Sequence, residues 1–266
     1  MQVASGPAAF AGPDPPVILV RDLVKRYRDF TAVGGLSLHV ARGELYALLG
    51  PNGAGKTTTI KCLVGLLRPS AGSIEVAGSD IVREPSLAKR RLGYVPDRPF
   101  LYDKLTGAEL VGFMAELYGL APGPVRERAD RYFAEFELHG WEDELIETYS
   151  YGMRQKLVLA SVFARDHEAL VIDEPMVGLD PKAARALRHM LVAQARAGKA
   201  ILMSTHSIQA AEMVADRIGI VAAGRLVAEG TLEELRQRAR LPGSGLEDVF
   251  LHLTHEERVP SAPPLA

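Results

Sequence analysis

The sequence is poor in cysteine, in net charge and in long apolar runs. Cys62 is the single cysteine among 266 residues, so the chain cannot build an internal disulfide framework and a reducing compartment such as the cytosol fits. The formal net charge of −2 gives no electrostatic reason to expect nucleic acid as the main partner. No apolar stretch approaches the ~18–20 residues that a helix needs to cross a bilayer.

The two ends of the chain and its histidines also carry little signal. Residues 1–16 are rich in alanine, glycine and proline and lack a basic start, so we expect a loose leader rather than a secretory signal. Residues 254–266 are expected to form a flexible tail. The 7 histidines are scattered without the spacing of metal ligands. What lies between has 47% hydrophobic and 24% charged residues, as in an ordinary globular protein.

A glycine-rich loop stands between a predicted strand and a predicted helix. Residues 50–58 (Gly-Pro-Asn-Gly-Ala-Gly-Lys-Thr-Thr) fit the phosphate-loop pattern G-x-x-x-x-G-K-[ST]. Residues 44–49 predict a buried strand before the loop, and residues 58–67 predict a helix after it. Backbone N–H groups and the positive end of the helix dipole then meet at one point, which suits a phosphate. Lys56 can reach the β- and γ-phosphates, and the Thr57 hydroxyl can bind Mg²⁺.

Two carboxylates and a histidine are predicted at the same sheet edge. Residues 169–173 and 200–204 are continuous apolar runs, typical of parallel strands covered on both faces. Asp173 and Glu174 end the first run, so we expect Asp173 to hold Mg²⁺ through water and Glu174 to act as general base. His206 follows the second run and is a candidate γ-phosphate sensor. A solvated strand end would look alike in isolation, but the nearby phosphate loop favours function.

Two predicted helix starts have an ordinary structural explanation beside a functional one. Asp180 and Pro181 suit the N-cap and the first turn of a helix, and an N-cap aspartate can also contact a partner subunit. Ser150 and the backbone at Gly152 form another helix N-terminus that suits phosphate. On the residues alone, this second start is a helix cap with a weak functional signal.

The remaining apolar patterns predict the architecture. They indicate a strand at residues 17–20 that residues 23–27 continue, and further strands at residues 36–40, 72–78 (an edge strand), 92–96, 218–221 and 225–228, the last two as a hairpin. Apolar residues at three- and four-residue spacing predict helices within residues 100–166. We therefore expect an α/β fold. Residues 17–99 and 167–230 would form a parallel or mixed core sheet with an N-terminal antiparallel β subdomain, residues 100–166 an inserted α-helical subdomain, and residues 231–253 C-terminal helices.

These motifs, in this order, resemble those of the nucleotide-binding subunit of ATP-binding cassette (ABC) transporters. The resemblance covers residues 17–253 and implies a P-loop NTPase fold of ABC type that binds ATP and Mg²⁺. The motifs look like the Walker A loop (residues 50–58, including Asn52, Gly53, Ala54, Gly55 and Thr58), Walker B with its catalytic glutamate (residues 169–174), the D-loop (residues 178–181), the H-switch (residues 204–206) and the signature motif (residues 149–153). Tyr27 lies where the family stacks an aromatic ring on adenine, although it could equally be an ordinary strand tyrosine.

Two positions depart from the family pattern. Asp97 stands where the family has the glutamine of the Q-loop; its carboxylate could bind Mg²⁺ or orient water, but it adds negative charge beside a triphosphate. The signature reads Tyr-Ser-Tyr-Gly-Met, so Ser150 and Gly152 keep the phosphate-facing positions while Met153 cannot make the hydrogen bonds of a glutamine. Signatures of the Y-S-x-G-M-x-Q-K type resemble the branch that drives exporters of the ABC-2 type.

The resemblance also implies how such a chain works. Two subunits face each other head to tail, and ATP on Lys56 and Thr57 of one is completed by Ser150 and Gly152 of the other. Hydrolysis then opens this sandwich, and residues 97–106 pass the motion to transmembrane permease subunits. Because this chain has no predicted membrane-spanning helix, we expect the permease to be a separate chain. The subunit would then sit on the cytoplasmic, inner face of the membrane.

Other classes remain as alternatives. A soluble ABC ATPase of chromosome maintenance would need a long coiled coil, and one of translation usually carries two cassettes; neither is found in this sequence. A binding-only ATP sensor is disfavoured by Glu174 and His206 but left open by Asp97 and Met153. A GTPase or small-molecule kinase lacks support, because the sequence has no N-K-x-D guanine motif.

Overall fold

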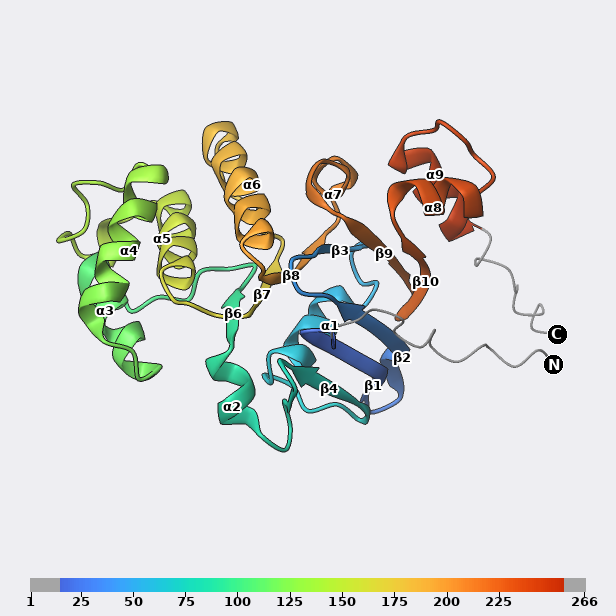
Figure 1. Ribbon diagram of the computed structural model, residues 1–266, viewed down its shortest axis with the longest axis horizontal. Coiled ribbons are helices and arrows are strands. Elements are labelled where there is room, and N and C mark those ends of the chain that lie inside the picture. Colours follow the sequence, from blue (N-terminus) through green and yellow to red (C-terminus); the bar gives the residue numbers. More distant parts are fainter. Residues whose placement is uncertain (1–14, 256–266) are drawn as a thin grey trace.

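Two β-sheets lie at the centre of the computed structural model, which describes residues 15–255 (Figure 1). Within these residues the larger sheet has six strands in the order β10-β9-β3-β8-β7-β6. These strands are β3 (Leu45–Leu49), β6 (Leu92–Val95), β7 (Ala169–Asp173), β8 (Ala200–Thr205), β9 (Arg217–Ala222) and β10 (Arg225–Gly230). All of its pairings are parallel except that of the β9–β10 hairpin. The predicted parallel core and the predicted hairpin are both confirmed.

The smaller sheet is antiparallel and lies beside the first. Its four described strands follow the order β2-β1-β4-β5: β1 (Ile18–Tyr27), β2 (Phe30–Val40), β4 (Ala71–Val76) and β5 (Ser79–Asp80). The strand predicted at residues 17–20 and continued through residues 23–27 is confirmed as one strand, β1, with register shifts along it. The prediction of residues 72–78 as an edge strand was wrong, because the two-residue β5 pairs with β4 and covers that edge.

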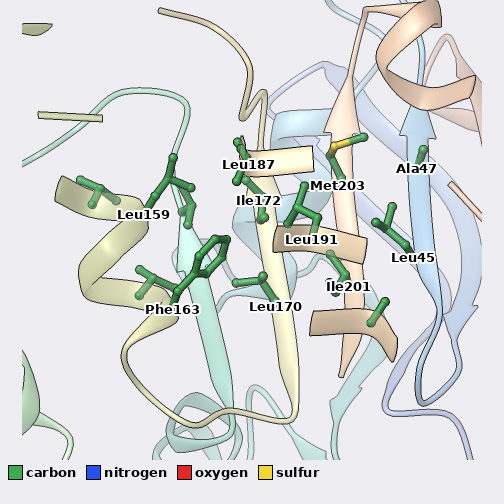
Figure 2. Close-up of a cluster of buried hydrophobic side chains, with 14 of the residues drawn as sticks. Leu45, Ala47, Leu159, Phe163, Leu170, Ile172, Leu187, Leu191, Ile201 and Met203 are labelled. Atoms are coloured by element: carbon green, nitrogen blue, oxygen red, sulfur yellow. The ribbon is translucent and has the colours of Figure 1, made fainter. Parts of the chain in front are cut away.

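The larger sheet is buried on both faces. Alternate residues of β3, β7 and β8 point toward the helices, and Figure 2 shows them packed against α5 and α6: Leu45, Ala47, Leu170, Ile172, Ile201 and Met203 against Leu159, Phe163, Leu187 and Leu191. The intervening residues face the antiparallel sheet and α1: Tyr46, Leu48, Val171 and Leu202 against Leu36 and Ile60. Because both faces are covered, these strands are continuous apolar runs rather than alternating ones.

Helices surround the sheets on several sides. They are α1 (Lys56–Leu63), α2 (Pro85–Arg90), α3 (Gly107–Leu117), α4 (Pro122–Glu135), α5 (Tyr151–Phe163), α6 (Pro181–Arg196), α7 (Ile208–Val214), α8 (Leu232–Arg238) and α9 (Leu246–His255), with a 3₁₀ turn η1 (Ile146–Thr148). Figure 1 places α3, α4 and α5 together at one end of the molecule and α8 and α9 at the other. Residues 100–166, predicted to be helical, contain α3, α4, η1 and α5. The sequence patterns did not predict α2 or α7.

Local sequence explains where some of these helices begin and end. Helix α1 was predicted at residues 58–67 but begins at Lys56, directly after the glycine loop. It ends at Leu63 because Gly65 adopts a left-handed φ of +70°, and the N–H of Leu66 then bonds the carbonyl of Lys61 at 2.8 Å. Thr106 and Glu109 form a capping box that starts α3.

Some expectations concern residues at the limits of the described chain. The leader expected at residues 1–16 and the tail expected at residues 254–266 lie largely outside the described residues, although Thr254 still belongs to α9. Between residues 15 and 255, no helix combines the length and the apolar character needed to cross a membrane.

Candidate functional site

The glycine loop bends sharply between β3 and α1. Gly53 has φ +80°, and Gly55, the residue before α1, has φ +101°; both values lie in the left-handed region that favours glycine. A Cβ atom on Gly55 would also lie 2.6 Å from the carbonyl oxygen of Ala32. The loop can therefore hold this shape only with glycine at these positions, and α1 begins directly after it, so the unpaired N–H groups of a helix start adjoin the loop, as anion binding requires.

Strand register brings the predicted catalytic segments to one sheet edge. Leu48 of β3 pairs with Ser204 of β8, and Ser204 pairs in turn with Asp173 of β7. The backbone N–H of Gly50 then donates to the carbonyl of Thr205 at 3.3 Å. The phosphate loop, Asp173 and the segment before His206 therefore leave the sheet side by side.

Lys56 folds back onto its own loop. Its side chain is only 6% exposed, and Nζ donates to the carbonyl oxygens of Gly50 at 2.7 Å and Pro51 at 3.2 Å. Burial lowers the pKa of Lys56, and the carboxylates of Glu174 and Asp173 partly oppose that shift. The ammonium is thus held at the mouth of the loop by weak acceptors that a phosphate can replace.

Asp173 is fully buried and only partly satisfied. The Ser204 hydroxyl donates to its Oδ1, whereas Oδ2 is buried without a hydrogen-bond partner in the described part of the chain. Burial raises the pKa of Asp173, and the nearby hydroxyl groups of Ser204 and Thr57 oppose that shift. A buried carboxylate oxygen without a donor, beside the Thr57 hydroxyl, fits a Mg²⁺ ion that completes its shell with water and phosphate.

A cage of protein side chains for a metal is not part of this site. Among residues 15–255, no group of three or more His, Cys, Asp or Glu residues is placed to hold a metal ion. Mg²⁺ commonly takes only one or two protein ligands and keeps waters and phosphate oxygens for the rest. Thr57 and Asp173 therefore match the expectation for Mg²⁺ delivered with a nucleotide.

Glu174 lies between Lys56 and His206. Its Oε2 is 2.9 Å from Nδ1 of His206 and accepts from the backbone N–H of His206 at 3.4 Å, while Oε1 is 3.7 Å from Nζ of Lys56. The backbone N–H of Glu174 donates to the carbonyl of Ser204 at 3.1 Å. Glu174 also has φ +50°, a strained conformation for a residue with a side chain. This backbone conformation, for which the sequence shows no local signal, places the carboxylate between the Lys56 ammonium and the His206 ring.

Asp97 follows β6 at the same edge. It is half-buried, and its charge is close enough to raise the pKa of Asp173. Its backbone carbonyl accepts a hydrogen bond from the Tyr151 hydroxyl at 3.5 Å. Asp97 therefore follows β6 at the sheet edge where Asp173 ends β7, and its charge acts on Asp173.

The signature segment is held apart from the phosphate loop of the same chain. Ser150 caps α5 by accepting from the N–H of Met153 at 3.3 Å, and Figure 1 shows α5 well separated from α1. Gly152 packs on the loop before α6, because a Cβ atom there would lie 3.2 Å from the carbonyl oxygen of Gly178. Ser150 is exposed, so this helix start remains open to solvent.

Asp180 and Tyr27 complete the predicted set. Asp180 caps α6 by accepting from the N–H of Ala183 at 2.8 Å, and its other oxygen lies 3.0 Å from Nζ of Lys156 in α5. Tyr27 ends β1 with 43% of its surface exposed, and Nζ of Lys25 lies 5.1 Å from the centre of its ring. Asp180 thus ties the start of α6 to α5, whereas Tyr27 lies at the end of β1 in the smaller sheet.

The sequence analysis missed several supporting residues. Ser204 was assigned only to the H-switch motif, yet its hydroxyl binds Asp173. The turn of the β9–β10 hairpin braces the phosphate loop, since Gly224 donates its N–H to the carbonyl of Ala54 at 3.0 Å and accepts from Gly34 at 2.8 Å. The turn itself was predicted from its Ala-Gly pair, but no local signal showed which loop it would meet.

Comparisons with known proteins agree with this geometry. The model of the ABC transporter family matches residues 33–177. The daunorubicin resistance ATP-binding protein DrrA3 of Streptomyces coeruleorubidus is 40% identical over 219 residues, which cover 82% of this chain and 69% of that protein. The Nod factor export ATP-binding protein I of Ralstonia nicotianae is 36% identical over 220 residues, 83% of this chain and 68% of that protein.

A solved structure gives the same answer. The structure of an ATP-binding subunit of an ABC transporter superposes with a TM-score of 0.86 at 35% sequence identity, covering 90% of this chain and 99% of that one. Nearly the whole of that subunit therefore superposes on this chain. On this evidence the chain belongs to the ABC transporter family, as an ATP-binding and ATP-hydrolysing member.

Proposed function

We propose that this chain is the motor subunit of an ABC exporter, in which ATP hydrolysis drives separate transmembrane permease subunits. The observation that carries the proposal is the placement of Glu174 between Lys56 and His206 at the edge where the phosphate loop and Asp173 emerge. A γ-phosphate bound by Lys56 would face both Glu174 and His206. The arrangement supports turnover rather than simple storage of ATP.

Each residue has a distinct part in the proposed reaction. Lys56 exchanges the carbonyls of Gly50 and Pro51 for phosphate oxygens, and the N–H groups of the loop bind the rest of the phosphate chain. Thr57 and Asp173, with Asp97 nearby, would hold Mg²⁺, which neutralises charge on the phosphates when bound. Glu174 accepts a proton from the attacking water, and His206 keeps that carboxylate oriented through its Nδ1 contact at 2.9 Å.

The site of a single chain is incomplete. Ser150 and Gly152 present a helix start that suits phosphate, but they lie on α5, away from α1 of the same chain. We infer that a second copy, arranged head to tail, brings its Ser150 and Gly152 over the triphosphate. Asp180 is exposed just before α6, and its carboxylate pairs with Lys156 of α5. Asp180 would therefore also contact the partner copy.

The segment after Asp97 carries exposed aromatic side chains that suit binding to a membrane protein. Phe100 and Tyr102 are 87% and 60% exposed, and Tyr102 packs edge to face on Phe113 of α3 with ring centres 5.5 Å apart. Exposed aromatic clusters mark interaction surfaces. We infer that permease subunits bind here and hold the motor at the inner face of the membrane. The names of the relatives, resistance to daunorubicin and export of Nod factor, favour export as the direction.

A hydrolysis-blocked variant tests the proposed reaction. Glu174→Gln should still bind ATP but release phosphate roughly 10²–10⁴ times more slowly, and should accumulate an ATP-dependent dimer. Phosphate release and the mass of the complex by light scattering would be measured together. Glu212→Gln, which changes an exposed glutamate on α7, is the matched control. Unchanged turnover in Glu174→Gln would refute the assignment of Glu174 as base.

A further inference from the structure

Gln155 is a polar side chain in a fully buried position of α5. It is 0% exposed, and within residues 15–255 neither its amide nitrogen nor its amide oxygen has a hydrogen-bond partner. A glutamine amide can donate two hydrogen bonds and accept two. Burying the amide without these bonds is unfavourable, because water satisfies both groups in the unfolded chain. The folded single chain therefore carries an amide whose bonding capacity is unused.

The position of Gln155 on α5 shows what it faces. Residues three and four apart on a helix share one face, so Gln155 lies on the same side as Gly152 and Tyr151, one turn earlier. Both of these residues contact Gly178. A Cβ atom on Gly178 would lie 2.5 Å from Cε1 of Tyr151, and a Cβ atom on Gly152 would lie 3.2 Å from the carbonyl oxygen of Gly178. Because Cα–Cβ bonds in a helix tilt toward its N-terminus, Gln155 is directed toward the loop that joins β7 to α6 (residues 174–180, the β7–α6 loop).

The neighbours of Gln155 on α5 define the two sides of its surroundings. Lys156 follows it in the sequence and reaches the end of the β7–α6 loop, with Nζ 3.0 Å from Oδ2 of Asp180. Leu159 lies one turn later on the same face and packs in the apolar core beside the larger sheet (Figure 2). Gln155 is therefore placed between an apolar core and the β7–α6 loop, and the loop backbone supplies the polar groups on that side.

The backbone of the β7–α6 loop is weakly bonded. In the described chain, the N–H of Val177 donates to the carbonyl of Glu174 at 3.2 Å, and the N–H of Leu179 donates to the carbonyl of Met176 at 3.4 Å. Both distances are at or beyond the long end of the ordinary range for such bonds. A small movement of the loop can therefore exchange them for bonds to the amide of Gln155.

We propose that Gln155 is a positioning residue whose amide bonds the backbone of the β7–α6 loop once a second copy closes over the nucleotide. The inference rests on the head-to-tail dimer of the proposed function. The loop begins at Glu174, the proposed base, and ends at Asp180, which would contact the partner copy. Bonds from Gln155 would hold both ends of the loop in place. The bonding capacity that is unused in the single chain then contributes to the free energy of closure instead of the free energy of folding.

The test separates folding from closure in the full chain. Gln155→Met replaces the amide by an apolar group of similar shape. Without nucleotide, Gln155→Met should unfold at a higher urea concentration than wild type, because it buries no unbonded amide. In the Glu174→Gln background, where ATP-dependent dimers should accumulate, it should weaken dimerisation in light scattering at least roughly tenfold, since a symmetric dimer loses the bonds of two amides. AMPPNP affinity at protein concentrations where no dimer forms should equal that of wild type, as measured by isothermal titration.

Two further variants exclude other causes. Gln237→Met makes the same chemical change at an exposed position of α8 and should alter neither urea unfolding nor dimerisation. Gln155→Leu should behave as Gln155→Met does, which excludes a specific effect of the thioether.

Each outcome bears on the role of Gln155. If both apolar variants unfold at lower urea concentrations than wild type, or do not fold, the amide is already bonded in the single chain and the inference is overturned. Equal dimerisation of Glu174→Gln with and without Gln155→Met would also overturn it, while the proposed function stands. If Glu174→Gln itself forms no ATP-dependent dimer, the head-to-tail dimer and the role of Gln155 fail together.

Discussion

The ring of Tyr151 occupies the space that a side chain at Gly178 would need. A Cβ atom on Gly178 would lie 2.5 Å from Cε1 of Tyr151, and Gly178 has φ +81°. Tyr151 is the first residue of α5, and its hydroxyl bonds the carbonyl of Asp97 at 3.5 Å. Three loops with family motifs therefore meet at one tyrosine: the one after β6, the one before α5 and the one before α6.

We predict that Gly178→Ala slows hydrolysis without weakening nucleotide binding. The added methyl group strains a backbone with positive φ and displaces the Tyr151 ring, which moves the start of α5 that the partner's nucleotide needs. The expected result is a fall in kcat of about tenfold, or ~1.4 kcal/mol, with AMPPNP affinity of the single chain within about twofold of wild type. Phosphate release and isothermal titration measure the two quantities.

A double-mutant cycle shows whether the two positions act through each other. Tyr151→Ala removes the ring that the new methyl group strikes, so the double variant should lose less activity than the two single variants predict together. Strictly additive losses would show that Gly178 does not act through Tyr151.

Replacing Asp97 by glutamine tests the departure from the family pattern. Asp97 adds a negative charge beside Asp173, and a cation at that position would feel both carboxylates. Asp97→Gln should therefore raise the Mg²⁺ concentration needed for half-maximal phosphate release several-fold. Asp130→Asn, at an exposed position of α4, is the control for a change in net charge. If Asp97→Gln leaves both the Mg²⁺ dependence and the maximal rate unchanged, this carboxylate has no special part.

The parts of the site that were predicted from the sequence are contiguous in the chain. A phosphate loop needs one strand, one glycine turn and one helix start, so residues 50–58 carry the whole signal. The edge that Asp173 and His206 share follows from the rule that parallel strands end together, which the pairing of Asp173 with Ser204 bears out.

What could not be predicted depends on contacts between distant segments. No local pattern says that the turn at Gly224 will support Ala54, or that Tyr151 will lie over Gly178; these meetings depend on how two sheets and α5 pack. Helices α2 and α7 could not be predicted for a different reason: they have only 6 and 7 residues, which is too short to show a clear helical period. The register shift near Ala32 also becomes visible only once the strands are paired.

Lys56→Ala should abolish ATP-dependent dimerisation while leaving the fold intact. The Lys56 ammonium is buried and donates to two loop carbonyls, so the fold does not lose a favourable exposed charge when it is removed. What the variant loses is the donor that would bind the phosphate oxygens of ATP. We expect at least a tenfold loss of AMPPNP affinity, since hydrogen bonds to charged groups are worth ~1.5–3 kcal/mol. Lys61→Ala, an exposed lysine on the same helix, should behave as wild type. Normal dimerisation of Lys56→Ala in light scattering would contradict the role of the loop.

His167 should make the folded protein sensitive to acid. It is buried beside Gly93 of β6, with Nδ1 bound to the carbonyl of Arg165 at 2.8 Å. Burial above all, and then the charges of Lys199 and Arg165, lower the pKa of His167 from 6.5 to about 3. As pH falls below 6.5 the unfolded chain therefore takes up a proton that the folded chain refuses, and stability is lost progressively toward pH 3.

The loss amounts to about 1.4 kcal/mol per pH unit, or about 2 kcal/mol between the ordinary pKa and about pH 5. Urea unfolding of wild type and His167→Gln at a series of pH values measures it. The variant should be less stable at neutral pH, because glutamine fits the cavity imperfectly, yet its stability should fall less steeply with acid. His189→Gln, at an exposed position of α6, should keep the wild-type slope. Parallel curves for wild type and His167→Gln would mean that His167 has the same pKa in the folded and the unfolded chain, which would contradict the lowering of its pKa by burial.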